Sequence, residues 1–116
     1  IETTMKYNLN NKTFRIVTNS DHGKVNSQTV FRYKQEGDQV SAEYEGGAIL
    51  KGNVLAKMED ESMKMIYQCL TTENELKAGR AVARLSMLQS GKIYMKLDWE
   101  WLGENTGKGH SEYIEN

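Results

Sequence analysis

The chain has 116 residues and a formal net charge of -1, from fifteen Lys and Arg against sixteen Asp and Glu. A chain of this length suits one domain with a single core, and its balanced charge offers no overall field that would collect nucleic acid or an anionic membrane surface. No apolar run approaches the roughly 20 residues of a transmembrane helix, and the one cysteine excludes an intrachain disulfide.

We expect a cytoplasmic protein. The single thiol, Cys69, falls in an alternating stretch where a small buried thiol is usual, and the first residues lack the hydrophobic block of a secretory signal. The predicted domain covers 5–116, with Met5 as a candidate start. Residues 1–4 are then an added or disordered N-terminus.

The first predicted strand follows a polar turn. Residues 8–12 are rich in Asn, which tolerates the left-handed backbone of turns, and Phe14 and Ile16 then alternate with Arg15 in a strand over 13–19. Residues 20–28 show no apolar periodicity and are predicted to form the longest interior loop. Long loops beside the mouth of a barrel often carry function.

From Thr29 the alternation takes the two-residue period of a β-strand. Phe31 and Tyr33 precede a turn at 36–38, and Val40, Ala42 and Tyr44 follow it, which predicts a hairpin.

Gly46 and Gly47 then reverse the chain into a strand over 48–58. One face of this strand is predicted to carry Leu50, Gly52, Val54, Ala56 and Met58. A glycine inside a strand marks a bulge or a barrel corner, so we expect one of these at Gly52.

The remaining strands are predicted at 63–71, 77–88, 93–101 and 110–115. Residues 77–88 have a helix-favouring composition, but Ala81, Ala83 and Leu85 alternate with polar residues as in a strand. The fourth of these segments closes the chain after a glycine-rich turn.

About eight strands in sequence order, with no helix of ordinary length and no proline, predict an all-β fold. An open meander would leave two unpaired edges, whereas closure satisfies both. We therefore predict a single antiparallel up-and-down barrel of the calycin or lipocalin-like kind, in which the last strand pairs with the first. Its lumen is either filled by side chains or holds one small ligand.

Five segments of the chain, 11–15, 29–37, 43–47, 99–101 and 108–109, together resemble a family of small uncharacterised bacterial proteins. Members of that family often carry the label N-acetylglutamate synthase. The resemblance spans nearly the whole chain and implies an acetyltransferase that uses acetyl-CoA and glutamate. The nearest match to an acetyl-CoA motif is 76–81, with Leu76 where Arg or Gln is usual and a strand-like pattern after it.

Aromatic residues on the predicted inner faces form the candidate ligand site. Arg84 is included because an inward guanidinium would require a carboxylate from the protein or from an anionic ligand. Whether Arg80 and Arg84 face inward stays open, since Val82 lies between them. The predicted ligand-binding residues are Phe31, Tyr33, Tyr44, Tyr67, Arg84, Trp99 and Trp101.

No catalytic, cofactor or metal site is predicted. His22, His110 and Cys69 lack the spacing of metal ligands, and Asp98 and Glu100 read as charges on the outer surface. The sequence favours a non-enzymatic barrel that binds a small apolar or amphipathic ligand. The alternatives are a solid barrel that acts through its surface, as an interaction or assembly module that could form homo-oligomers, and the acetyltransferase that the resemblance implies.

Overall fold

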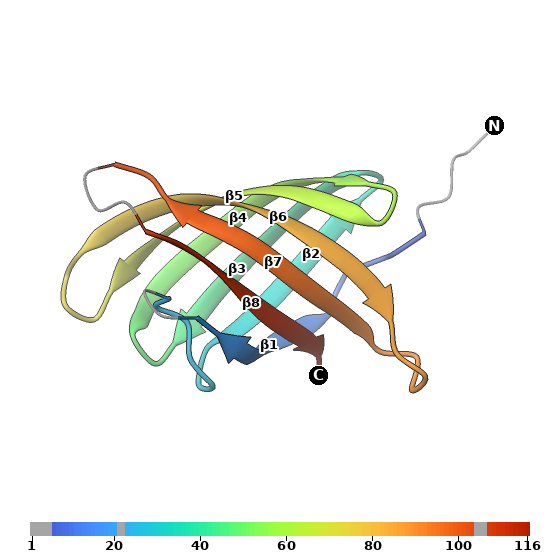
Figure 1. The fold of residues 1–116 in the computed structure, drawn as a ribbon, viewed down its shortest axis with the longest axis horizontal. Coiled ribbons are helices and arrows are strands. Elements are labelled where there is room, and N and C mark those ends of the chain that lie inside the picture. The colour runs from blue at the N-terminus through green and yellow to red at the C-terminus, as the bar shows by residue number, and fades with distance from the viewer. Residues whose placement is uncertain (1–5, 21–22, 104–106) are drawn as a thin grey trace.

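The computed structural model describes residues 6–20, 23–103 and 107–116, which form eight antiparallel strands paired in chain order (Figure 1). The strands are β1 (Thr13–Asn19), β2 (Val30–Glu36), β3 (Gln39–Gly46), β4 (Ile49–Glu59), β5 (Ser62–Thr71), β6 (Leu76–Met87), β7 (Ile93–Trp101) and β8 (Lys108–Glu115). β8 pairs with β1, so the sheet is closed. The predicted all-β up-and-down barrel is confirmed. The predictions for residues 1–5 lie outside the described residues.

Alternation of side chains separates the lumen from the outer surface. In β7 the side chains of Ile93, Met95, Leu97 and Trp99 are buried, while Lys96 and its outward neighbours are exposed or half-buried. The same pattern along the other strands gives one apolar core inside the barrel.

β4 departs from the predicted pattern at its beginning. Ile49 pairs with Thr71 and Lys51 with Leu70, so β4 has one more residue than β5 between these pairs and forms a β-bulge. The bulge turns Leu50 outward, where 54% of its surface is exposed, and restores the inward direction at Gly52. The prediction that Leu50 and Gly52 share a face was therefore wrong, and the irregularity lies before Gly52.

The two ends of the barrel differ. At one end the segment before β1 covers the lumen, with the side chains of Tyr7 and Leu9 buried in the core. The amide side chain of Gln35 holds this segment, since it accepts from the N–H of Leu9 and donates to the carbonyl of Tyr7. We call this the closed end. The opposite, open end lies where β1, β3, β5 and β7 end.

Three glycines near the open end each lie beneath an aromatic ring of the neighbouring strand. The pairs are Tyr44 with Gly52, Tyr67 with Gly79 and Trp99 with Gly109. A Cβ atom added to these glycines would lie 2.5 Å from Cε2 of Tyr44, 2.5 Å from Cζ of Tyr67 and 2.7 Å from Cζ2 of Trp99. The rings therefore lie flat across the backbone of the next strand, where only glycine leaves room.

We predict that Gly52→Ala destabilises the barrel by about 1–3 kcal/mol, because the new methyl group collides with the ring of Tyr44. That ring cannot retreat, since it stacks on Phe31 with centroids 4.5 Å apart. Urea unfolding measures the loss. In a Tyr44→Ala background the collision is absent, so the same substitution should cost clearly less. Equal costs in both backgrounds would contradict the proposed clash.

Candidate functional site: the open end of the lumen

The lumen retains a cavity of about 50 Å³ at the open end. Rings from two sides of the barrel line it. Phe31 and Tyr113 come from β2 and β8, and Tyr67 and Trp99 come from β5 and β7. The aromatic lining matches that of pockets for flat or apolar molecules.

The first ring cluster is centred on Phe31. Its ring stacks on Tyr44 and meets Tyr113 edge-on, with centroids 5.1 Å apart. Below it, toward the closed end, Tyr33 contacts Phe14 edge-on at 5.3 Å. These contacts hold the rings in place. The unfilled part of the lumen is the cavity between Phe31 and the open end.

The second cluster lies across the cavity. Trp101 contacts Tyr67 edge-on at 5.6 Å and lies 6.0 Å from Trp99 between ring centroids. The ammonium group of Lys77 lies over the ring of Trp101, 4.8 Å from its centroid, at a distance typical of a cation–π contact. The cavity is thus bounded by aromatic faces with a cation at its rim.

The structure brings most of the predicted site residues together. The rings of Phe31, Tyr44, Tyr67, Trp99 and Trp101 all line the cavity. Their proposed contact with a ligand stays a prediction.

Two of the predicted residues lie elsewhere. Tyr33 points inward but is packed one layer deeper, beside Phe14, and does not line the cavity. Arg84 is exposed on the outer face, because Ala81 and Ala83 take the inward positions of β6. The direction of Arg84, which the sequence left open, is outward, so its inclusion among the candidate ligand-binding residues is not supported by its position. Arg80 also points outward and pairs with Glu100.

The sequence predicted the loop over 20–28 but named none of its side chains as part of the site. Residues 23–28, which we call the strap, cross the open end, and the half-buried side chains of Lys24 and Val25 line the cavity. Val25 packs against the core, and its carbonyl accepts from the side chain of Asn19. The one signal in the sequence was a lone valine in a polar loop.

Polar atoms in the wall are few. The hydroxyl of Tyr44 donates to the carbonyl of Gln68 at 3.1 Å, and that of Tyr67 to the carbonyl of Glu100 at 3.4 Å. Ser111 is 1% exposed on the inward face of β8, and the interaction of its hydroxyl with that of Tyr113 slightly opposes the effect of burial on the Tyr113 pKa. Ser111 does not line the cavity.

Burial keeps the lumen uncharged. It raises the pKa of Tyr113 to about 12 and moves the pKa of Tyr33, Tyr44 and Tyr67 further above the usual value for a phenol. Burial also raises the pKa of the Cys69 thiol, which stays protonated near neutral pH.

The described residues contain no group of three or more His, Cys, Asp or Glu side chains placed to hold a metal ion. No helix in the described part of the chain is long and apolar enough to span a membrane. His22 lies outside the described residues.

The sequence matches the family model of avidin-like proteins over residues 7–116. The chain belongs to the avidin-like family. The closed eight-stranded barrel agrees with this membership, since streptavidin and lipocalins are barrels of this size that hold one small ligand. No curated protein and no solved structure matches the chain significantly.

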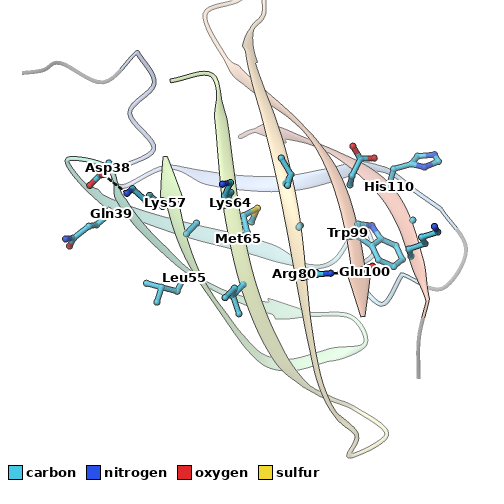
Figure 2. Close-up of a pocket in the computed structure, with 17 residues that line it drawn as sticks. Asp38, Gln39, Leu55, Lys57, Lys64, Met65, Arg80, Trp99, Glu100 and His110 are labelled. Atoms are coloured by element: carbon cyan, nitrogen blue, oxygen red, sulfur yellow. Dashed lines mark hydrogen bonds and ion pairs between the residues drawn. The ribbon is translucent and has the colours of Figure 1, made fainter. Parts of the chain in front are cut away.

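A second hollow lies on the outside of the barrel. A shallow groove of about 1320 Å³ runs over the outer faces of β4 to β8, and Figure 2 shows Leu55 toward its left side, below the Asp38–Lys57 pair, with Arg80 and Glu100 farther to the right. Leu55, Ile66 and Val82 are 71%, 66% and 45% exposed there. Ion pairs between Asp38 and Lys57 and between Arg80 and Glu100 flank them.

We predict that the barrel loses stability as the pH rises from 10 toward 12. Unfolded tyrosines release protons near pH 10, whereas Tyr113 in the barrel holds its proton until about pH 12, so the unfolded state binds fewer protons in this range. Below pH 10 this contribution is fully present. Urea unfolding at stepped pH measures the decline, and phenolate absorbance should rise together with unfolding. Reversible ionisation of these tyrosines near pH 10 in the folded protein would contradict the burial argument.

Proposed function

We propose that this protein is a non-enzymatic barrel that binds one small apolar or amphipathic molecule at its open end. The observation that carries the proposal is the ring-lined cavity at the open end of the lumen. Membership of the avidin-like family supports it, since the family shares the closed barrel architecture that holds small ligands.

The size of the cavity sets a condition on this proposal. A volume of about 50 Å³ holds only a few water molecules, whereas ligand pockets measure roughly 300–1,000 Å³. A ligand must therefore displace part of the present lining. The strap is the part that can move, because it lies outside the hydrogen-bonded ladders of the barrel.

Among the described residues, the contacts that hold the strap over the cavity are mostly made by side chains, including the bond from Asn19 to the carbonyl of Val25. Lys24 lies 3.9 Å from Glu75 at the far side of the opening, and the N–H of Gly23 makes a long bond of 3.4 Å to the carbonyl of Ser20. The base of the strap is firmer, since Thr29 donates to the carbonyl of Gly46. Movement of Val25 out of the core would join the cavity to solvent and add the volume that Val25 now fills.

We predict that the neutral fluorophore N-phenylnaphthylamine binds at the open end and quenches tryptophan fluorescence saturably. Val25→Ala should tighten this binding by about threefold to tenfold, because the probe then no longer has to displace a packed valine side chain to open the cavity. Val17→Ala, at an exposed position of β1, is the matched control and should leave binding unchanged.

A second readout locates the probe. Cys69 lines the cavity and is the chain's one cysteine, so a bound probe should slow its alkylation. Trp99→Ala should remove the fluorescence response, with circular dichroism confirming that the barrel remains folded. Binding that leaves the alkylation rate of Cys69 unchanged, or no binding at all, would contradict a ligand site at the open end.

The acetyltransferase activity that the resemblance implies lacks a matching site geometry in the barrel. The candidate motif at 76–81 lies in β6, not at a helix N-terminus. Gly79 is paired with Tyr67 on one side and Trp101 on the other. A backbone engaged in both ladders does not present the convergent N–H groups that hold a pyrophosphate.

The outer groove favours a second candidate function, assembly through a two-fold contact between copies of this chain. Leu55 pairs with Ile66 across β4 and β5, and both side chains are more than half exposed. Exposed apolar side chains rimmed by charges of both signs are typical of interaction surfaces. A two-fold axis through such a patch would bury the apolar centre and place unlike charges opposite each other.

We predict that Ile66→Lys weakens self-association by at least about tenfold, because it buries an unpaired ammonium at the centre of the contact. Sedimentation over a range of protein concentrations measures the association constant. Leu50→Lys is the control, since Leu50 is 54% exposed outside the groove. A protein that is monomeric at all concentrations would contradict this second function.

A further inference from the structure

Lys77 occupies an inward position at the open end of the barrel. It lies two residues before Gly79 and four before Ala81, which both face the lumen, and it pairs directly with the inward Cys69 of β5. The side chain is half-buried. A lysine in this register directs its charge toward the lumen mouth, unlike the outward Arg80 and Arg84 of the same strand.

The ammonium group of Lys77 rests on an aromatic face. It lies 4.8 Å from the ring centroid of Trp101, and no carboxylate among the described residues comes within 4.0 Å of it. A cation–π contact leaves the other sides of an ammonium group open to hydrogen-bond acceptors. Lys77 can therefore receive an anion without breaking an ion pair described in the structure.

A second cation approaches from the strap. Lys24 lines the cavity and lies 3.9 Å from Glu75, a distance at the limit of an ion pair, with both side chains partly exposed. Around the Cys69 thiol, the described residues thus place the ammonium groups of Lys24 and Lys77 against the carboxylate of Glu75. The positive charges of Lys77 and Lys24 lower the pKa of the Cys69 thiol, although burial raises that pKa by more. The positive field of the two lysines therefore reaches the lumen wall.

We propose that the open end binds the anionic head group of an amphipathic molecule, with Lys77 and Lys24 as its counter-charges and the ring-lined cavity around its apolar body. This inference rests on the proposed function and specifies the class of ligand. A carboxylate or sulfonate at the mouth would pair with Lys77, with Lys24 of the strap as a second positive charge at the same end, while the flat or aliphatic body replaces Val25 among the rings.

The arrangement distinguishes an anion from a neutral or cationic ligand. Near the Cys69 wall of the described mouth, a cation would meet Lys77 and Lys24 with Glu75 as their one opposing charge, and a neutral body would gain nothing from either lysine. An anion gains a charge-assisted contact with Lys77 and the attraction of Lys24 in a partly desolvated mouth, where such interactions are stronger than in water.

The test compares two probes that share one apolar body. Anilinonaphthalene sulfonate carries an anionic group that N-phenylnaphthylamine lacks. We expect the sulfonate to bind the wild-type protein at least about tenfold more tightly than the neutral probe. Lys77→Gln should weaken the sulfonate by about fivefold to tenfold and leave the neutral probe within about twofold. Lys51→Gln, at an exposed outer position of β4, is the matched control and should change neither affinity.

The outcomes separate the two proposals. If the neutral probe binds at the open end but the sulfonate gains no affinity, or if Lys77→Gln weakens both probes equally, the anionic class is wrong and the ligand site stands. If neither probe binds, the proposed function fails together with this inference. Loss of sulfonate binding in Lys51→Gln but not in Lys77→Gln would place the anion outside the barrel and overturn the inference.

Discussion

Hydrogen bonding between β1 and β8 closes the sheet, and the interior volume, the two faces and the open end all depend on that closure. Once eight strands form a ring, the lumen has a limited width that inward side chains must fill. The seam is uneven. β1 follows β8 as far as Asn19, but its pairing with β2 ends where Arg15 meets Val30. The ladder between β1 and β2 therefore opens toward the mouth, at the place where the strap and the cavity lie.

The positions of three glycines decide where the lumen is left unfilled. Gly52, Gly79 and Gly109 lie near the open ends of β4, β6 and β8, and each lets an aromatic ring of the preceding strand lie flat against the wall. Rings held against the wall take up less of the centre. At the closed end no such recess is needed, because Leu9 and Phe14 are fully buried there and fill the space directly. The cavity at one end thus follows from the pairing of large rings with the smallest residue.

Alternation along single strands was enough to predict the fold and most of the ring cluster, because a two-residue period fixes which side chains share a face. It could not decide the face of Arg84. That choice comes from packing across strands, where Ala81 opposes Trp99 and the small residue makes room for the large one. The depth of Tyr33 depends on the register with its neighbours, and the place of Val25 depends on a loop whose docking leaves no period in the sequence. The outward turn of Leu50 comes from a bulge, which also breaks the period.

The position of the inward charge follows from the cost of burying it. An arginine pointing inward from the middle of β6 would need a buried partner, and the outward side of the strand provides Glu100 for Arg80 at no such cost. At the strand's open end an inward lysine is tolerated, because its apolar stem packs along the wall while the ammonium group reaches the solvent at the mouth. The barrel can therefore be apolar in its depth and positive at its rim. An amphipathic anion would match both regions in one orientation, with its charge outermost. The distribution of polarity that lets Lys77 point inward at low cost would therefore also set the orientation in which such a ligand enters.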